Sequence, residues 1–341
     1  MTVLRIGVVG AGANTRGRHI PGFQEIEGVE VVAVANRTRE SAQKVADEFG
    51  ISGVFEDWRE LVRSDDVDAV CVGTWPYRHC SITLESLKAG KHILTEARMA
   101  MNLAEARQML AASQQSDRVS MIVPAPMYLE TEAALLAMVA DGYFGDFLEI
   151  HVDALSGDYD PEALLHWRQR RDLSGNNIMA MGIYNETVRR YAGHEKAISA
   201  HATSFATQRM DSESNQRLPA DVPESLGILA EMESGATAVY HISSVARMGE
   251  SGIEMHGTRG AFKLDDNGAW IAGEGDSAYR KLEVPLEEQG GWRVEAEFVD
   301  AIRDGTTVTH TNFDDGVKYM EFTEAVNVSL AEGRRVELPL G

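Results

Sequence analysis

The chain has 341 residues and a mass of 37.4 kDa, which predicts two domains or one large one. Hydrophobic residues make up 44% of the chain and charged residues 25%, which excludes a mostly disordered chain, a collagen-like fibre and a disulfide scaffold. The 53 acidic residues outnumber the 32 Lys and Arg residues, and the resulting net charge of −21 disfavours nucleic acid and anionic membranes as partners. We expect a small-molecule partner instead.

Cysteine and histidine usage gives no sign of a cross-linked or metal-dependent protein. Cys71 and Cys80 are too few for a disulfide framework and fit no zinc pattern, and the histidines lack metal-site spacing, so no metal is predicted. The N-terminal residues carry no cleavage signal, and no apolar run approaches the roughly 18 residues of a membrane span. We expect a reducing, cytoplasmic setting.

The first third of the chain alternates short apolar runs with amphipathic stretches. The runs, which predict buried strands, are residues 4–9, 29–35, 67–73, 92–95 and 119–123. Helices are expected after Thr38, where Gly50 ends the pattern, and over residues 103–113. This alternation predicts right-handed βαβ units and a parallel sheet covered on both faces.

The rhythm changes after Val123, where Pro124 and Pro126 interrupt it and a helix over residues 132–140 follows. Segments with β character then dominate, at residues 147–154, 197–206, 225–232, 237–244, 252–256 and 261–264. Residues 211–215 and 265–276 are expected to be loops, and helices are expected near 294–302 and 316–330. The predicted fold class is α/β: a Rossmann dinucleotide-binding domain at 1–123, and a C-terminal α+β domain at 124–341 whose large, mostly antiparallel open sheet serves substrate binding and oligomerisation.

A glycine-bearing turn follows the first strand directly. Gly10 and Gly12 have the spacing that lets backbone N–H groups approach a pyrophosphate at a helix N-terminus. The third glycine of the G-x-G-x-x-G motif is replaced by Thr15, and the next glycine comes only at Gly17. A tight strand-to-helix turn is the alternative, but the place of the motif in the first βαβ unit favours a dinucleotide site. The predicted site residues are Gly10, Gly12, Asn14, Thr15 and Arg16.

The end of the second strand indicates which nucleotide is bound. An acidic residue there accepts the ribose hydroxyls of NAD. This chain has Asn36, Arg37 and Thr38 instead; Asn36 removes the charge that would repel a 2′-phosphate, and Arg37 can form a fork to one. We therefore predict NADP as the cofactor. NAD is the alternative, with Arg37 a solvated surface residue and Asn36 binding the ribose through its amide.

Two further runs, Thr74-Trp75-Pro76-Tyr77-Arg78-His79 and Gly90-Lys91-His92-Ile93-Leu94-Thr95-Glu96, make the sequence similar to the glucose–fructose oxidoreductase/inositol dehydrogenase/MocA (Gfo/Idh/MocA) family. Trp167-Arg168 and Gly182 extend the resemblance into the second half. The family implies a Rossmann domain, a second domain with a large open sheet, and NAD(P)-dependent chemistry at a hydroxyl or carbonyl, commonly of sugars and cyclitols. The resemblance also implies that the cofactor site includes Thr74, Trp75, Pro76, His79 and Glu96.

The sequence departs from this family at its catalytic positions. Glu-Lys-Pro appears as Glu96-Ala97-Arg98, so the usual catalytic lysine is missing. Asp-x-Gly-x-His-x-x-Asp appears as residues 180–187, AMGIYNET, in which both acids are gone and Tyr184 takes the histidine position. Some members carry tyrosine there, and Gly182-Ile183-Tyr184 resembles them, although those members normally keep the lysine.

Hydride transfer requires a group that moves a proton at the reacting oxygen. We predict Tyr184 for this role, provided that a nearby cation lowers its pKa from about 10 towards neutrality. Arg98 and Arg168 are the predicted cations because the resemblance places their motifs at the active-site cleft. The alternative for Tyr184 is a packed aromatic whose hydroxyl binds a carbonyl.

Five predicted site residues also have structural alternatives. Trp167 and Arg168 either stack on and fork to the substrate or form an ordinary surface pair. Glu96 either holds the nicotinamide ribose or caps a turn. His79 is more often a satisfied structural histidine than a cofactor ligand. Trp75 either narrows the nicotinamide site or packs under its loop.

The predicted function is an NAD(P)-dependent oxidoreductase acting on a hydroxyl or carbonyl of a sugar-, cyclitol- or sugar-acid-like substrate. Two alternatives stay open. One is a redox-neutral lyase, hydrolase or isomerase with tightly bound nucleotide. The other is a nucleotide-binding protein without catalysis, which the loss of the lysine and both acids leaves open. A large sheet with one uncovered face predicts a homodimer or homotetramer.

Overall fold

The computed structural model describes residues 3–341 and divides the chain into two compact units. The first unit comprises Met1–Pro124 and Arg293–Met320, and the second comprises Ala125–Trp292 and Glu321–Gly341. The first boundary lies one residue beyond the predicted one. The structure differs from the prediction in Arg293–Met320, which joins the first unit because Phe313, Tyr319 and Met320 pack in its hydrophobic core.

The first unit is built on a six-stranded parallel sheet with the order β3-β2-β1-β4-β5-β6. Its strands are β1 (Leu4–Val9), β2 (Val29–Ala35), β3 (Gly53–Phe55), β4 (Ala69–Val72), β5 (His92–Thr95) and β6 (Ser120–Ile122). The Rossmann prediction is confirmed. Each residue of β4 is buried, as expected for a strand covered on both faces.

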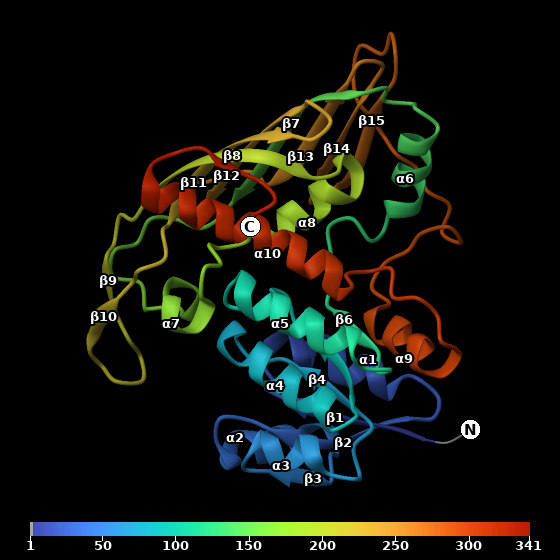
Figure 1. Cartoon of the computed structure of the whole chain (residues 1–341), viewed down its shortest axis with the longest axis vertical. Helices are drawn as coiled ribbons and strands as arrows, with labels where there is room; N and C mark the ends of the chain where they lie inside the picture. Colours follow the sequence, from blue (N-terminus) through green and yellow to red (C-terminus); the bar gives the residue numbers. More distant parts are fainter. Residues whose placement is uncertain (1–2) are drawn as a thin grey trace. The chain divides into compact units, whose positions relative to one another are not determined.

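Helices surround this sheet (Figure 1). They are a π-helix at Thr15–His19, α1 (Ile20–Gln24), α2 (Arg39–Phe49), α3 (Trp58–Arg63), α4 (Pro76–Lys88), α5 (Leu103–Gln114) and α9 (Val294–Asp304). The Thr38 hydroxyl accepts the Ser41 N–H at the start of α2, and Gly50 ends that helix in the left-handed region with φ of 71°. Helix α9 packs beside α1, with the Phe23 and Phe298 rings 6.3 Å apart.

The second unit contains a nine-stranded sheet with the order β16-β15-β14-β13-β7-β12-β11-β8-β17. Only β7 and β12 pair in parallel, so the prediction of a mostly antiparallel sheet is confirmed. The strands are β7 (Phe147–Leu155), β8 (Glu195–Thr203), β11 (Ser225–Met232), β12 (Thr237–Ser243), β13 (Gly252–Gly257), β14 (Ala261–Asp265), β15 (Gly268–Ala272), β16 (Arg280–Lys281) and β17 (Val336–Glu337). A separate hairpin joins β9 (Gln208–Met210) to β10 (Arg217–Pro219).

Helices cover one face of the nine-stranded sheet (Figure 1). The helices of this unit are α6 (Glu132–Ala140), α7 (Arg171–Ser174), α8 (Met181–Ala192) and the later part of α10 (Phe313–Glu332). Phe322 of α10 packs on Tyr240 of β12, with ring centroids 5.3 Å apart. No helix within residues 3–341 is both long and apolar enough to cross a bilayer.

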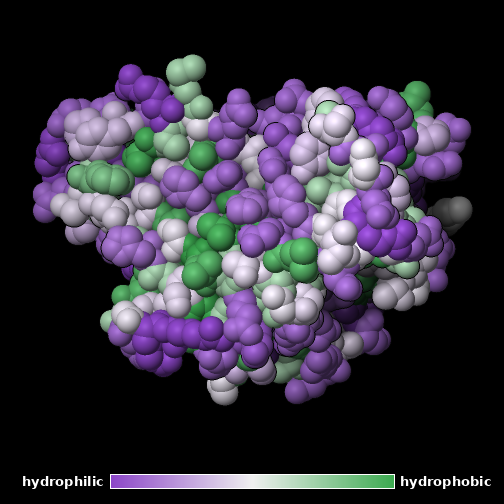
Figure 2. All heavy atoms as spheres, turned by 90° about the horizontal axis from the view of Figure 1, so that it is seen from above, coloured by the Kyte–Doolittle hydropathy of each residue, from purple (hydrophilic) through white to green (hydrophobic). Residues whose placement is uncertain are grey.

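The other face of the sheet carries the outward residues of the alternating strands. On it Leu229 of β11 stands opposite Val239 of β12, and both side chains are exposed. His151, Asp153 and His241 lie on the same face. Figure 2, viewed from above, shows a mostly hydrophilic face on which hydrophobic side chains gather in patches.

The prediction that residues 265–276 form a loop is wrong. Gly268–Ala272 forms β15, which pairs with β14 across a tight turn at Asp265–Gly268. The indole Nε1 of Trp270 donates to Asp265 Oδ1 at 3.2 Å, and Ile271 is buried in the core. The Asn267-Gly268 pair between two apolar runs is a hairpin signal that the polar composition of the segment obscured.

Candidate active site

The turn after β1 requires glycine at its first position. Gly10 has φ of +86°, and its N–H donates to the Ala35 carbonyl at 2.8 Å. A Cβ on Gly10 would lie 2.7 Å from the Thr74 backbone nitrogen, so any side chain would strain the turn. The next turn closes when the Arg16 N–H donates to the Gly12 carbonyl at 3.0 Å. The turn therefore begins as a dinucleotide motif does.

Thr15 occupies the third motif position because the neighbouring loop makes room for it. Thr15 is 1% exposed, and its hydroxyl donates to the Gly10 carbonyl at 3.4 Å. A Cβ on Gly73, which follows β4, would lie 2.0 Å from the Thr15 hydroxyl oxygen. The motif usually achieves close packing here with a third glycine. In this chain a glycine in the loop after the neighbouring strand β4 provides the space instead.

The two residues that follow β2, Asn36 and Arg37, carry no carboxylate. Asn36 Oδ1 accepts the Ala11 N–H at 2.7 Å, so this side chain supports the glycine turn directly. Arg37 is exposed, and its guanidinium lies 5.9 Å from the centre of the Trp75 ring.

Two other predicted cofactor residues make contacts with helix α2. Arg16 pairs with Glu48 of α2 at 2.5 Å, and the Thr38 side chain caps the N-terminus of α2.

The loop from Thr74 to His79 follows β4. Thr74 Oγ1 is buried and has no hydrogen-bond partner within residues 3–341. Pro76 is the first residue of helix α4. His79 is fully buried, with Nδ1 2.9 Å from the Arg98 carbonyl oxygen and Nε2 2.8 Å from that of Thr74. Burial lowers the pKa of His79, although both carbonyls oppose the shift. Since both ring nitrogens are engaged, the structural alternative is favoured for His79.

Glu96 lies at the carboxyl end of β5 and belongs to a buried network that the sequence patterns did not reveal. Its Oε1 accepts from Asn14 Nδ2 at 2.5 Å and from His19 Nε2 at 3.1 Å. The other ring nitrogen of His19 lies 2.5 Å from Glu295 Oε1, on α9. His19 and Glu295 were missed because 276 residues separate them and no spacing rule joins them.

These residues fit a nicotinamide dinucleotide. Gly10 and Gly12 expose backbone at a strand-to-helix turn, and a Cβ on Gly12 would meet the protein no closer than 3.6 Å. The Thr74 hydroxyl lacks a partner among the described residues. Both hydrogen bonds to Glu96 end on Oε1, which leaves Oε2 as an acceptor beside the turn.

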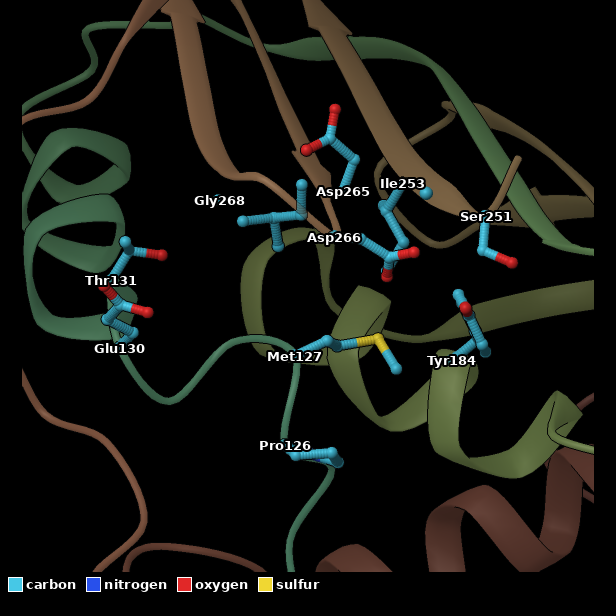
Figure 3. A pocket seen from close by; sticks show the side chains of 12 residues that line it. Pro126, Met127, Glu130, Thr131, Tyr184, Ser251, Ile253, Asp265, Asp266 and Gly268 are labelled. Carbon is cyan, nitrogen blue, oxygen red and sulfur yellow. The ribbon is translucent and has the colours of Figure 1, made fainter.

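In the second unit, Tyr184 lines a cavity of about 230 Å³ (Figure 3). Tyr184 is in the first turn of α8, as predicted. The cavity is also lined by Pro126, Met127, Glu130, Thr131, Ser251, Gly252, Ile253, Leu264, Asp265, Asp266 and Gly268. Carboxyl and hydroxyl groups thus provide the polar side chains of this lining.

The expectation that a cation lowers the pKa of Tyr184 is wrong for this structure. Burial raises the pKa of Tyr184; a hydrogen bond with Ser251 opposes the rise, and the carboxylates of Asp266 and Asp153 add to it. Tyr184 is therefore a neutral phenol over the ordinary pH range.

The three remaining predicted residues lie apart from the lining of this cavity. Arg168 is in a 3₁₀ turn with its guanidinium 4.4 Å from the centre of the Trp167 ring, and neither residue lines the cavity. Arg98 is in the first unit, 2% exposed, and the peptide bond joining Ala97 to it is cis.

Comparison with known proteins agrees with this architecture. The levoglucosan dehydrogenase complex with NADH and L-sorbose has a TM-score of 0.87 to this chain at 22% identity, covering 99% of this chain and 100% of that one. The 1,5-anhydro-D-fructose reductase of Ensifer adhaerens is 29% identical over 261 residues, which are 75% of this chain and 74% of the relative. The dTDP-3,4-didehydro-2,6-dideoxy-alpha-D-glucose 3-reductase of Streptomyces violaceoruber is 32% identical over 187 residues, 53% of this chain and 52% of the relative.

Family matches cover most of both units. Residues 4–123 match the oxidoreductase family with an NAD-binding Rossmann fold, and residues 133–263 match the GFO/IDH/MocA C-terminal domain. Together with the strand order and the glycine turn, these matches show that the chain belongs to the Gfo/Idh/MocA family of NAD-binding oxidoreductases.

Proposed function

We propose that the protein is an NADP-dependent reductase of a carbonyl group on a neutral, sugar-like substrate. The observation that carries the proposal is the glycine turn, where bare backbone at Gly10 and Gly12 lies near the Thr74 hydroxyl and the carboxylate of Glu96. The Thr74 hydroxyl has no hydrogen-bond partner in the described part of the chain. These groups lie at the carboxyl ends of parallel strands, where open α/β sheets bind nucleotides.

NADP is favoured over NAD by the end of β2. Asn36 presents no negative charge there, and its Oδ1 is already engaged by the Ala11 N–H. The exposed guanidinium of Arg37 beside the Trp75 ring provides a planar, permanently charged group for a 2′-phosphate. Arg37→Asp should therefore reverse the preference between the two nucleotides.

Tyr184 is the proposed proton donor. NADPH, when bound, would supply the hydride for the carbonyl carbon. The neutral phenol of Tyr184 would give its proton to the carbonyl oxygen, so that an alcohol forms. A raised pKa suits this direction, because the phenol is protonated at the start of the reaction. Arg98, Arg168 and Trp167 lie outside the lining of the cavity and are given no role in this step.

The substrate class follows from the charges of the cavity. Glu130, Asp265 and Asp266 line it together with the hydroxyls of Thr131 and Ser251. Carboxylates repel a uronate or sugar phosphate, whereas hydroxyls and carboxylates hydrogen-bond to neutral polyols. The similarity to a 1,5-anhydro-D-fructose reductase supports a neutral sugar-like substrate.

Tyr184→Phe tests the proton role. We expect the rate of NADPH oxidation with the best sugar substrate to fall by about 10²–10⁴-fold, with nucleotide affinity unchanged. Tyr159→Phe, which alters an exposed tyrosine outside the cavity, is the matched control. A Tyr184→Phe enzyme with the wild-type rate assigns the proton to another group.

A nucleotide-binding protein without catalysis is the second candidate, and Ala97 at the usual lysine position favours it. Loss of the lysine removes a group that ordinary dehydrogenases of the family use. Nucleotide binding with no turnover over a broad panel of sugars would support this candidate over the reductase.

We also propose a homodimer or homotetramer formed through the open face of the nine-stranded sheet. Leu229 is 55% and Val239 is 38% exposed there, side by side on neighbouring strands. Light scattering should give at least twice the chain mass, and Leu229→Arg should lower it.

A further inference from the structure

We propose that His19 is a positioning residue of the nucleotide site: as a buried cation between Glu295 and Glu96, it fixes the Glu96 carboxylate so that Oε2 stays available to a ribose hydroxyl. The inference rests on the proposed nucleotide site and assigns it two residues, His19 and Glu295, that the sequence patterns did not. The substrate cavity in the second unit plays no part in it.

The geometry holds Glu96 from one side only. Asn14 Nδ2 and His19 Nε2 reach Oε1 at 2.5 and 3.1 Å, whereas Oε2 receives no hydrogen bond from residues 3–341. The His19 side chain has no exposed surface, but that of Glu96 keeps 16%. A carboxylate oriented by two donors on one oxygen is poised to accept on the other.

The fold makes specific room for the second acid. Glu295 is 4% exposed and comes from α9, in the segment that returns to the first unit late in the chain. A Cβ on Gly22 of α1 would lie 2.9 Å from Glu295 Oε2, so the glycine permits the close approach of that carboxylate. A π-helix at Thr15–His19 places both of its end residues in the interior.

Electrostatics keep the ring of His19 charged. Burial alone would lower the pKa of His19, but hydrogen bonds with Glu295 and Glu96 outweigh burial and raise the pKa to about 9. The pKa of the Glu96 carboxyl is lowered in return. Burial alone would raise this pKa, but the hydrogen bond with His19 and the charge of His19 more than reverse that rise. Both members are therefore ionised at neutral pH.

Two further titratable groups lie close to this network. Cys71 on β4 is neutral, since burial and then the charges of Glu96 and Glu295 raise the pKa of its thiol well above the usual value. Burial lowers the pKa of His79 on α4, although the hydrogen bonds to the Thr74 and Arg98 carbonyls oppose that shift. Arg16, on the same π-helix as His19, is engaged by Glu48. The cation between the two acids is therefore the ring of His19.

The test compares His19→Gln and Glu295→Gln with a matched control, Glu297→Gln. Glu297 also lies on α9 and also pairs with a histidine, His310 Nδ1, at 2.7 Å, but it has no hydrogen bond to Glu96. Two readouts are needed: the protonation state of His19 by ¹⁵N NMR of the nucleotide-free protein, and the Kd of NADP⁺ by calorimetry between pH 6 and pH 10.

We expect the ring of His19 in the wild type to titrate near pH 9, and at lower pH in Glu295→Gln. His19→Gln should weaken NADP⁺ binding roughly tenfold at pH 7, as expected when a charged hydrogen bond that orients the acceptor is lost. His19→Gln should also abolish the weakening of NADP⁺ binding that loss of the His19 charge causes near pH 9 in the wild type. Glu297→Gln should match the wild type in both readouts.

The inference is overturned if His19 is neutral at pH 7, or if the fully folded His19→Gln protein binds NADP⁺ with wild-type affinity and pH dependence. Should His19→Gln fail to fold, Glu295→Gln gives the same decision through the shift of the titration. A wild-type protein that binds neither nucleotide refutes the proposed function instead, while the NMR titration still reports the charge of His19.

Discussion

At the scale of single residues, the environment decides the chemistry more than the residue type does. Two acid–base groups have pKa values that their residue types do not reveal. The pKa of Tyr184 is raised by burial and by two carboxylates, and the pKa of His19 is raised to about 9 despite its burial. Sequence patterns located Tyr184 correctly on α8, yet assigned it cationic neighbours where the structure has Asp266 and Asp153. These pKa shifts depend on residues that are distant in the chain, and the sequence alone does not show which residues come together in the fold.

The charge of His19 predicts how stability depends on pH. Because its folded-state pKa lies above its ordinary value of 6.5, the stabilisation is complete below pH 6.5 and is lost as pH rises through about 9. The full contribution is on the order of 3 kcal/mol, from 1.36 kcal/mol per pKa unit. Urea unfolding at pH 6, 8 and 10 should show a smaller loss in Glu295→Gln than in Glu297→Gln. Equal losses in the two variants would contradict this assignment.

At the scale of elements, periodicity and caps predicted most of the fold. Strands β1, β2 and β5, together with helix α6, have the predicted bounds because uninterrupted apolar runs and clear end signals define them. Strand β15 was missed since its polar turn dominates the local composition, and the β9–β10 hairpin has strands of only three residues each. The glycine turn was located correctly, whereas the reason that Thr15 is tolerated lies in Gly73, in the loop after β4.

Substitutions of Gly10 and Gly12 in the turn after β1, and of Gly17 in the π-helix, distinguish an effect on folding from an effect on binding. Gly10→Ala should lower the free energy of unfolding by about 1–3 kcal/mol, because its φ is positive and Thr74 is in the way. Gly12→Ala should stay folded, since its Cβ meets no atom closer than 3.6 Å. It should lose nucleotide affinity, because the added methyl group would occupy space that the proposed pyrophosphate site needs. Gly17→Ala has open space and is the control, with stability raised by about 0.5–1 kcal/mol. Thermal melts and calorimetry check all three, and wild-type affinity in Gly12→Ala would refute the assignment of the turn.

At the scale of the whole molecule, the chain does not divide at one point. Helix α9 and the first part of α10 complete the nucleotide-binding unit, where the Met99 N–H donates to the Tyr319 hydroxyl at 2.6 Å and Glu295 reaches His19. Composition and periodicity indicated two domains, but they could not show that Arg293–Met320 packs back into the first unit. The amphipathic pattern of a helix is the same whichever unit it packs against. The net charge of −21 agrees with a small-molecule partner, although the nucleotide itself is anionic and depends on local backbone N–H groups.

The most direct test of the account is a calorimetric titration of the purified wild-type protein with NADP⁺ and NAD⁺, with Gly12→Ala alongside. The account predicts one saturable site per chain, tighter binding of NADP⁺ than of NAD⁺, and much weaker binding in the folded Gly12→Ala protein. A wild-type protein that takes up neither nucleotide at millimolar concentration would contradict the central claim that the turn after β1 holds a dinucleotide.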